Sequence, residues 1–474
     1  MFIKNKKKTS IILAFCMALS MFATACNKKP AEDDSVVTNV ITSSNSESIS
    51  DNGAETQVPQ NEPQPDMTIT ITDDAGNQVT DSNGSAVTIA VTTGPAATTT
   101  TAGPTETLSP EASKAIEDAL TQKPTEITTV VKPSQIANGD KYAYNTLTED
   151  EKALYDAIVY CSESMIYRLN AQNVDKKTWS KILGLVYFQE PQLFWLNSTI
   201  LVGKLYFLEY DTNEIARMQK EIDATVAKIM KDADAKTTTF DKLKVFHDYI
   251  VKNSNFEKST EDGAYNSSIY SVLSGKVGNV QCSGYAKAMK YLCDQAGINC
   301  MVITGNNKDG SSHAWNIVDV DGAWYNIDVT WDDPKLPTPD SNYLRHTFFL
   351  VPDKWIKDIS HFNANVKDFA FGTVKYFTPP SCTESSQNYF AKKNMIYSDA
   401  ASAEAAIKSQ IDSVLASNGK VIEIRCENKE VYNAVYKKLK DYQTYAREKS
   451  SKVKGLSDMC TEAMLIIELD VQYN

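Results

Sequence analysis

The sequence predicts an α+β protein, and three observations point to that class. Apolar residues recur at helical spacing over residues 150–252 and again after Cys282. Residues 298–331 then show a buried-strand pattern, followed by two alternating runs on either side of a tight turn. Residues 378–474 alternate helical and strand patterns. A helical part, an antiparallel hairpin beside a helix and a small α/β module therefore follow one another along the chain.

Length, charge and cysteine content limit the function classes. A chain of 474 residues is long enough for two to four domains, and 42% of its residues are apolar. The net charge of −12 argues against nucleic acid as a partner, because phosphate binding needs basic patches. Nine cysteines occur without a C-x-x-C pair, so a zinc site is not expected. Seven remain after Cys16 and Cys26, and an odd number cannot all pair.

Residues 1–26 have the layout of a bacterial targeting segment. Four lysines between positions 4 and 8 precede the apolar run 11–25, which is too short to span a bilayer comfortably. The run ends in "ATAC", which resembles a lipobox with Cys26 as the lipid-modified residue. We therefore expect an extracytoplasmic protein, lipid-anchored to the outer face of the cell membrane. Cleavage by the ordinary signal peptidase and free secretion is the alternative.

Residues 27–140 predict a disordered tether. They are rich in Ser, Thr, Asn, Asp, Pro and Gly and almost devoid of aromatic residues, so they cannot bury enough apolar surface to offset the entropy of ordering. An eight-residue repeat, "DDAGNQVT" then "DSNGSAVT", could form one hairpin, which would be marginally stable by itself.

Residues 141–235 predict a mainly helical subdomain. Thr148 and Glu151 form a capping box, and Leu154, Ile158 and neighbouring apolar residues then recur at helical spacing. An aromatic-rich stretch, "LGLVYFQEPQLFWLN", follows. Further helices are expected at about 214–232 and, at the start of the next domain, about 239–252.

The sequence predicts that residues 236–377 form the catalytic domain. A helical pattern follows Cys282 and stops at Gly297. The run "INCMVITG" predicts a buried strand, and "SHAWNIVDV" and "AWYNIDVTW" flank Asp321-Gly322, a strong hairpin turn signal. Residues 378–474 predict a small α/β module of helix, strand, helix and strand, in which nothing looks catalytic.

Cys282 and His313 are the candidate nucleophile and base. Cys282 stands where a helix begins, and the partial positive charge of a helix N-terminus favours a thiolate. A nucleophilic thiol also needs a group that accepts and returns a proton, and His313 is the obvious partner. Ser283 and Gly284 are small, so a substrate could approach the thiol.

The hairpin turn also predicts the residue that orients His313. If Asp321-Gly322 is the turn, opposite residues have numbers that sum to about 643, and His313 and Asp328 share a face in diagonal positions. Diagonal Cβ atoms are about 7 Å apart, within reach of a histidine–carboxylate hydrogen bond. A slip of one residue would move Asp328 to the opposite face. The most natural register therefore completes a Cys-His-Asp triad.

These motifs resemble the transglutaminase-like superfamily of papain-like cysteine enzymes. Its bacterial members carry C-x-G-Y-A, H-A-W-N and W-Y-x-x-D-x-T-W-D, and here "CSGYA", "HAWN" and "WYNIDVTWD" occur in that order within residues 240–335. The resemblance implies a cysteine-bearing helix packed on an antiparallel sheet. It also implies Cys282 as nucleophile, His313 as general base and acid, and Asp328 as the residue that orients His313.

Other residues have weaker or structural interpretations. The backbone N–H of Cys282 is a natural oxyanion donor, with the side chains of Tyr270 and Gln281 as candidates. For Tyr270 a packed aromatic residue is the favoured interpretation, because aromatic side chains usually fill cores. Cys293 and Cys300 fall on apolar patterns and predict structural thiols. Three further groups of residues have structural interpretations. His247 is interpreted as a hydrogen-bonded structural histidine, and Asp332 and Asp333 as turn residues. Trp315, Trp324 and Trp331 are interpreted mainly as residues that pack the sheet. No metal site and no cofactor are expected.

Three functions remain open at this stage. The first is a cell-surface cysteine enzyme that attacks a protein, peptide or cell-wall amide and forms a thioester, which water or an amine resolves. The second is a catalytically silent binding or scaffold lipoprotein on the same fold. The third is an adhesion or solute-binding lipoprotein in which residues 378–474 bind. The intact triad favours the first.

Overall fold

The computed structural model describes the folded part of the chain from residue 142 onward, with short gaps, and two strands before it. The described residues are 67–70, 88–91, 142–167, 169, 171, 174–198, 202–208, 211–257, 264–334, 343–357, 366–369 and 372–474. The expected targeting segment, its Cys26 and most of the expected tether lie outside them. Within the tether, β1 (Met67–Thr70) and β2 (Thr88–Val91) pair as one antiparallel hairpin on either side of the repeat.

The leading helices bury one apolar face each. A complete capping box at Thr148 and Glu151 starts the second of them, as the sequence predicts. The fourth, predicted at about 214–232, runs from an Asp211 cap and is two residues longer at each end. The helices are α3 (Tyr142–Asn145), α4 (Glu149–Glu163), α5 (Lys176–Gln189), α6 (Thr212–Asp234) and α7 (Thr239–Lys252).

An antiparallel sheet forms the centre of the molecule, and the predicted α+β class is confirmed. Its order is β5 (Cys300–Asn306), β6 (Ser312–Val320), β7 (Ala323–Ile327) and β8 (Phe349–Val351). The helix α9 (Cys282–Gln295) packs against β5 and β6. Asp321 and Gly322 have φ angles of 56° and 87°, the left-handed conformation that a type I′ hairpin turn requires.

Short elements frame the start of α9 and the edge of the sheet. The strand β3 (Ser254–Phe256) pairs in parallel with β4 (Gly278–Val280), which leads directly into α9. Between these two strands lie the 3-10 turn η2 (Ala264–Ser267) and the helix α8 (Tyr270–Leu273). A hairpin of β9 (Val366–Phe369) and β10 (Gly372–Lys375) and the helices α10 (Asp353–Ile356) and α11 (Tyr389–Lys392) follow the sheet.

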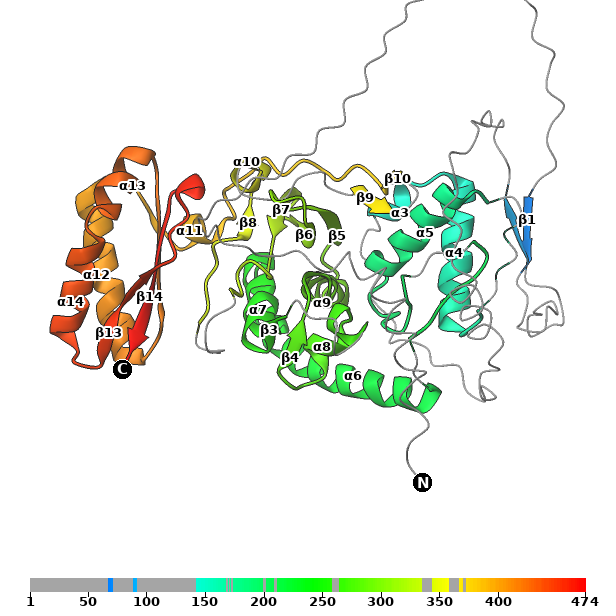
Figure 1. Ribbon diagram of the computed structural model, residues 1–474, viewed down its shortest axis with the longest axis horizontal. Coiled ribbons are helices and arrows are strands. Elements are labelled where there is room, and N and C mark those ends of the chain that lie inside the picture. Colours follow the sequence, from blue (N-terminus) through cyan, green and yellow to red (C-terminus); the bar gives the residue numbers. More distant parts are fainter. Residues whose placement is uncertain are drawn as a thin grey trace, which may run out of the picture.

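The C-terminal module is a separate sheet with helices on one face (Figure 1). Its sheet order is β11, β12, β14, β13, and its elements are β11 (Ile396–Tyr397), α12 (Ala400–Ser417), β12 (Val421–Cys426), α13 (Lys429–Tyr436), α14 (Leu439–Lys449), β13 (Val453–Asp458), η3 (Glu462–Met464) and β14 (Ile466–Tyr473). The prediction of a single second helix in this module is wrong: that segment forms two helices, α13, which packs on β12 and β14, and α14, which packs on β13. The strand β13 was not expected.

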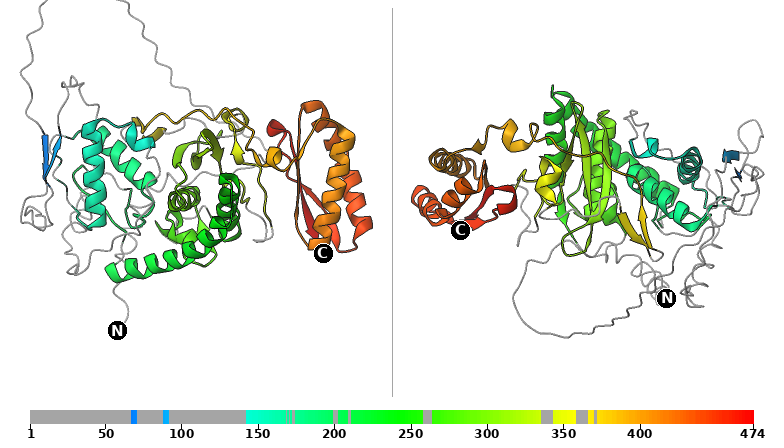
Figure 2. Two further views of the ribbon diagram at one scale, coloured as in Figure 1. Left: turned by 180° about the vertical axis from the view of Figure 1, so that it is seen from behind. Right: turned by 90° about the horizontal axis from the view of Figure 1, so that it is seen from above.

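The parts are arranged in a row (Figure 2). One continuous hydrophobic core runs from α4 and α5 into α9 and the central sheet, and includes Trp179, Trp195, Tyr285 and Ile303. The C-terminal module has a core of its own, and a third, smaller cluster with Phe348 and Ile466 joins that module to the central sheet. The domain boundaries at residues 235 and 377 therefore stay predictions. Among the described residues, none of the helices combines the length and apolarity that crossing a bilayer needs.

Candidate active site

Cys282 is the first residue of α9. The preceding Gln281 has extended backbone angles and the N-cap position, but its side chain makes no capping hydrogen bond. The backbone N–H groups in the first turn of a helix have no acceptor within that helix, so they concentrate partial positive charge around the thiol. Cys282 is partly exposed, whereas the next residues along α9 from Gly284 to Cys293 are buried. The thiol therefore stands at the exposed start of an otherwise buried helix.

His313 lies on β6, the strand against which α9 packs, and its ring contacts Asp328. The distance from His313 Nε2 to Asp328 Oδ2 is 2.6 Å. Both residues are only 2% exposed, so little water competes for this bond. The sequence prediction that these two side chains meet is confirmed by this contact.

The predicted hairpin register explains the contact. Partners along β6 and β7 run from Val320 opposite Ala323 to Asn316 opposite Ile327, so every pair sums to 643. The ladder between these strands stops before His313, whose backbone pairs with Gly305 of β5 instead. Asp328 follows directly after β7, and its backbone N–H donates to the Phe348 carbonyl.

Asp328 uses its second oxygen to hold the turn that follows it. The backbone N–H of Trp331 donates to Asp328 Oδ1 at 3.0 Å. The Trp331 ring then lies edge-on to the His313 imidazole, with centroids 6.3 Å apart, and Trp315 stacks parallel to that imidazole at 5.9 Å. Both carboxylate oxygens and the imidazole are therefore fixed by groups on β6 and in this turn.

The packing interpretation of the tryptophans is confirmed for two of them. Trp315 is buried, and its indole N–H donates to Asn326 Oδ1 at 3.0 Å. Trp324 packs edge-on against Tyr142 of the leading helices, at 5.6 Å between centroids. Trp331 is partly exposed and, like Trp315, lies against the imidazole, so it combines a contact with His313 and access to solvent.

Tyr187 of α5 is a site residue that the sequence prediction missed. Burial, and next the negative charge of the Cys282 thiolate, raise the pKa of Tyr187 to about 12. The phenol therefore stays protonated at neutral pH, and it is hydrogen-bonded with the Ser267 hydroxyl, which donates to Gln281 beside Cys282. The Lys287 ammonium lies 3.1 Å from the centroid of the Tyr187 ring. The leading helices therefore reach the candidate site. In the sequence, only the composition of the aromatic-rich stretch "LGLVYFQEPQLFWLN" pointed to this.

The two oxyanion candidates have different surroundings. Gln281 is buried next to Cys282, and its Oε1 accepts a 2.6 Å hydrogen bond from the Ser267 hydroxyl, which orients the side-chain amide. The Tyr270 hydroxyl donates to Glu221 at 2.7 Å and accepts from Arg217 at 3.2 Å, both on α6. The oxyanion assignment of Tyr270 is therefore corrected: its single proton is engaged at the surface of α6.

The role of Gly284 is also corrected. A Cβ atom at this position would lie 2.6 Å from the Asn266 carbonyl oxygen and 2.7 Å from Val280 Cγ1. Gly284 is buried, so its small size serves close packing of α9 against η2 and β4 rather than the approach of a substrate.

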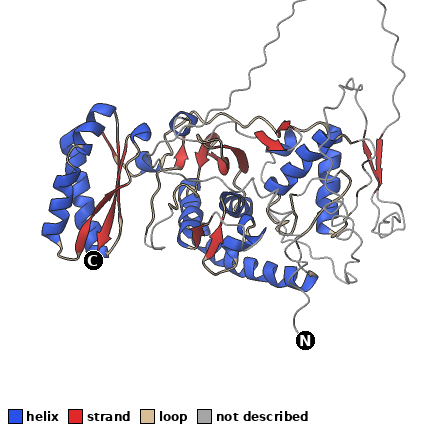
Figure 3. Ribbon diagram, in the orientation of Figure 1, coloured by secondary structure: helices blue, strands red, loops and turns tan. Residues whose placement is uncertain are grey.

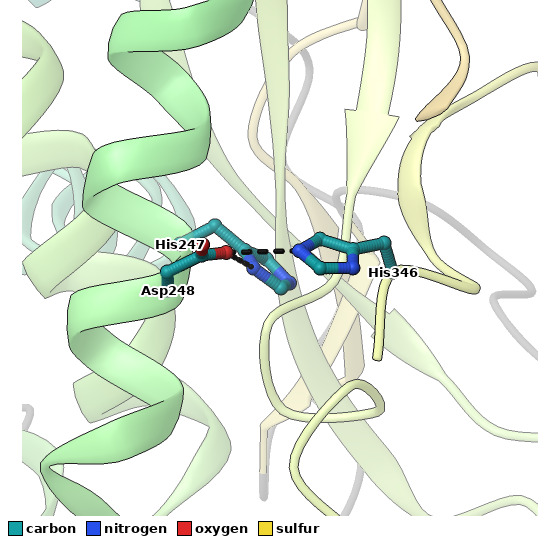
Figure 4. Close-up of side chains that lie close together, drawn as sticks. All are labelled: His247, Asp248 and His346. Atoms are coloured by element: carbon teal, nitrogen blue, oxygen red, sulfur yellow. Dashed lines mark hydrogen bonds and ion pairs between the residues drawn. The ribbon is translucent and has the colours of Figure 1, made fainter. Parts of the chain in front are cut away.

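One group of described residues has the composition of a metal site: His247, Asp248 and His346, with ligand atoms within 4.8 Å of one another (Figure 4). Its geometry is that of an ion-pair network. Asp248 Oδ1 lies 3.2 Å from His247 Nδ1 and 2.9 Å from His346 Nε2, and Lys244 contacts its other oxygen. These direct contacts account for the cluster without an ion, and the expectation of no metal stays a prediction.

The outer nitrogens of both histidines also meet carboxylates. His247 Nε2 lies 3.0 Å from Asp332 Oδ2, and His346 Nδ1 lies 3.1 Å from Glu423 Oε1. Burial by itself would lower the pKa of His247, but the hydrogen bonds and charges of Asp248 and Asp332 outweigh it and raise the pKa to about 9. The interpretation of His247 as a hydrogen-bonded structural histidine is therefore confirmed.

The two acidic residues after Trp331 are hydrogen-bonded as well as part of a turn. Asp332 is fully buried and accepts from the Phe348 backbone N–H as well as facing His247. Asp333 accepts from the Tyr285 hydroxyl, and burial raises the pKa of Asp333 to about 7. Nothing in the sequence distinguishes these residues from exposed turn carboxylates.

The described cysteines other than Cys282 are buried or partly buried, and none of the seven forms a disulfide. Burial raises the pKa of Cys161 to about 12 and that of Cys293 well above its ordinary value, where the adjacent Cys300 also contributes. A thiol held protonated is a poor nucleophile. The structural interpretation of Cys293 and Cys300 is consistent with their positions within α9 and β5.

Comparisons with known proteins match the central part of the chain. Residues 223–329 match the family model of the transglutaminase-like superfamily. Kyphoscoliosis peptidase from Homo sapiens is 33% identical over 18% of this chain, and the Mus musculus protein is 32% identical over the same share. The alignment covers 15% of either peptidase. A crystal structure of a TGase aligns at 18% identity and a TM-score of 0.23, over 28% of this chain and 36% of its own.

The family match covers α7, β3, β4 and α9 and ends at residue 329, one residue after Asp328. It therefore includes the candidate nucleophile, the candidate base and the carboxylate that contacts this base. The leading helices before residue 223 and the C-terminal module lie outside it. Residues 223–329 of this chain are a transglutaminase-like domain.

Proposed function

We propose that this protein is a cysteine-dependent enzyme that cleaves or transfers an amide through a thioester, with Cys282, His313 and Asp328 as its triad. The observation that carries the proposal is the 2.6 Å contact between His313 Nε2 and Asp328 Oδ2 on the strand against which the Cys282 helix packs. A buried carboxylate that accepts from one ring nitrogen fixes the imidazole and stabilises its protonated form. The other nitrogen, Nδ1, is then the atom that exchanges protons.

The chemistry follows from these roles. The proton of Cys282 Sγ passes to His313 Nδ1, and the thiolate attacks the carbonyl carbon of an amide. The resulting oxyanion accepts from the backbone N–H of Cys282 and from the side-chain amide of Gln281. When the tetrahedral intermediate collapses, the C–N bond breaks, the imidazolium protonates the leaving amine, and a thioester remains on Sγ. Water or an amine then attacks the thioester, gives its proton to Nδ1, and releases the thiolate.

We favour hydrolysis of a protein, peptide or cell-wall amide over transfer to an amine. Cys282 is partly exposed at the start of α9, and water is the default acceptor in an accessible site. In keeping with the "ATAC" sequence, we propose that Cys26 carries a lipid that anchors the enzyme to the outer face of a bacterial membrane. Residues 27–140 would then separate the folded part from that membrane.

The alternative is a catalytically silent binding or scaffold lipoprotein on the same fold. The two proposals differ in the reactivity of Cys282. An ordinary thiol has a pKa of about 8.5, whereas a thiolate–imidazolium pair forms well below that pH.

The experiment is alkylation of the full chain by iodoacetamide across pH 5–9, read at the Cys282 peptide by mass spectrometry. For the enzyme we expect reaction well below pH 8, and a loss of that reactivity in His313→Ala. Cys460, the other partly buried thiol, is an internal reference, since burial holds its pKa far above neutrality. If Cys282 titrates as an ordinary thiol in both proteins, the binding-module alternative takes its place.

A further inference from the structure

We infer that the C-terminal module positions the catalytic centre, because a pair of carboxylates on its sheet, Glu423 and Glu468, holds residues 343–348 and through Arg345 the turn that carries Asp328. The inference rests on the proposed function, and it assigns a role to a module that lies outside the family match. Figure 3 shows the helices of this module on the far face of its sheet, so that the other face is turned to the central domain.

The two carboxylates form an unusual pair within the module. Glu423 on β12 lies directly opposite Glu468 on β14, and they are 5% and 0% exposed. Like charges directly opposite each other destabilise a sheet, and burial of an ionised carboxylate without partners is strongly unfavourable. Their neighbours Ile424 and Ile467 point to the core of the module, so the two carboxylates point away from it. Such a buried pair needs another segment to supply cations and hydrogen-bond donors.

Residues 343–347 supply the partners of Glu468. The Arg345 guanidinium donates through Nη1 to both carboxylate oxygens, at 3.1 and 3.2 Å. The Tyr343 hydroxyl donates at 2.6 Å and the Thr347 hydroxyl at 3.0 Å. Burial of Glu468 raises the pKa of its carboxyl, which Arg345 opposes. Each of these donors belongs to the central domain, so the contact joins the two parts.

Glu423 binds the residue between them. The His346 backbone N–H donates to Glu423 Oε2 at 3.0 Å, and His346 Nδ1 lies 3.1 Å from Oε1. The imidazole stacks on Tyr389 with centroids 3.9 Å apart. Glu423 thus fixes the same segment as Glu468, but through His346 instead of through the guanidinium that reaches the Trp331 carbonyl.

Arg345 connects Glu468 to the triad. Its Nε donates to the Trp331 carbonyl oxygen at 3.1 Å, and its Nη2 contacts the same oxygen. The N–H of Trp331 donates to Asp328, and its ring contacts His313. One guanidinium therefore links the carboxylate of the module to the residue that fixes the orienting carboxylate. Glu468 and Arg345 are positioning residues in this arrangement.

The test compares Glu468→Gln with the unmodified full chain in the Cys282 alkylation assay across pH 5–9. The variant keeps the shape of the side chain but removes the charge that holds Arg345. We expect the alkylation profile to move about one pH unit upward, which makes the reaction about tenfold slower at pH 6. The unfolding midpoint in urea is measured in parallel, because the variant also removes the nearer of two counter-ions of a buried guanidinium and leaves Asp332, whose Oδ1 lies 3.7 Å from Arg345 Nε.

Two further variants separate positioning from general loosening. Arg345→Lys keeps the charge for Glu468 but loses the planar fork that also reaches the Trp331 carbonyl, so it should shift the alkylation profile with little change in the urea midpoint. Glu423→Gln removes the neighbouring carboxylate. It should lower the urea midpoint but shift the alkylation profile less than Glu468→Gln does. Asp412→Asn, at an exposed ion pair with Lys449, is the neutral control.

The outcomes distinguish this inference from the proposed function. If Cys282 of the unmodified chain has an ordinary thiol profile, the proposed function fails. Suppose instead that Cys282 of the unmodified chain reacts well below pH 8, and that Glu468→Gln and Arg345→Lys react with the same pH profile. The proposed enzymatic function is then supported, and the positioning role of Glu468 and Arg345 is overturned. An equal shift in Glu423→Gln would also overturn it, because the effect would then come from docking of the module rather than from Arg345.

Discussion

His313 Nε2 and Asp328 Oδ2 are 2.6 Å apart, although the residues are separated by 15 positions in the chain. The distance is set by a hairpin whose turn, Asp321-Gly322, fixes which residues face each other. The same carboxylate holds the Trp331 N–H through its other oxygen, so one side chain orients both the imidazole and the turn beside it. The geometry makes this contact the first target for mutation.

Replacing Asp328 by Asn should weaken the thiolate–imidazolium pair. The amide keeps the size of the side chain but lacks the charge that stabilises an imidazolium, and it can hold the ring in the wrong tautomer. We expect alkylation of Cys282 at pH 6 to fall at least about tenfold, a shift of about one unit in its apparent pKa. The measurement is the pH profile of the modified Cys282 peptide.

Asp319→Asn is the matched control for this variant. Asp319 lies on the same strand as His313, but its carboxylate accepts from the Gly322 N–H at the exposed turn, which an Asn oxygen does equally well. Its profile should coincide with that of the unmodified protein. A shift of equal size in both variants would mean that the hairpin, rather than the carboxylate at Asp328, controls the thiol.

Removing the Tyr187 hydroxyl should slow reaction at Cys282 to a smaller extent. The phenol stays protonated at neutral pH and is hydrogen-bonded with the Ser267 hydroxyl, which in turn donates to Gln281 beside Cys282, so its removal loosens the residues next to the thiol. For Tyr187→Phe we expect a decrease of about two- to tenfold in the alkylation rate at pH 6, the size of one net hydrogen bond. Tyr160→Phe, at an exposed ring, is the control. An unchanged or faster rate would remove Tyr187 from the site.

The stability of the protein should depend on pH through His247. Its pKa is about 9 in the folded state against an ordinary value of 6.5, so the folded state binds the proton more tightly. This contribution is complete below pH 6.5 and is lost as the pH rises through 9. Its full size is about 3 kcal/mol by linkage. The measurement is the free energy of unfolding in urea at pH 6, 7.5 and 9.

The variant His247→Gln should lose that dependence. Its free energy of unfolding should lie below that of the unmodified protein at pH 6, and the gap should narrow as the pH rises to 9. Asp333 also titrates, with a pKa that burial raises to about 7, and the charge of His247 acts on it, so both proteins carry Asp333→Asn in this comparison. If the free energies of unfolding of the two proteins change with pH in parallel, protonation of His247 is not the source of the pH dependence.

Adding a methyl group at Gly284 should disturb the start of α9. The new Cβ would overlap the Asn266 carbonyl oxygen, which is backbone and cannot rotate away. For Gly284→Ala we expect a loss of about 1–3 kcal/mol in the free energy of unfolding, typical of overpacking, and slower alkylation of Cys282. Ser283→Ala, at the neighbouring position, should be close to neutral. Normal stability in Gly284→Ala would show that η2 can move.

The sequence predicted the central contact because a hairpin is a local structure. The Asp-Gly turn and the period of two along each strand fix the facing residues without reference to the rest of the fold, which is why His313 and Asp328 could be paired from their numbers alone. The start of α9 at Cys282 is local in the same sense. Tyr270 failed as an oxyanion donor because its hydroxyl meets Glu221 of α6, a contact 49 residues away in the chain.

By itself the sequence determined the α+β class, the helix that begins at Cys282 and the register that brings His313 to Asp328. Only the tertiary structure decided which polar residues are buried. Glu468 and Glu423 stand on alternating strand positions that in an isolated module would face water, and Asp332 looks like any turn carboxylate. The two glutamates are buried because a segment distant in sequence lies on them and supplies Arg345 and His346. Burial and pairing between distant segments depend on how the elements dock, and no local pattern encodes that.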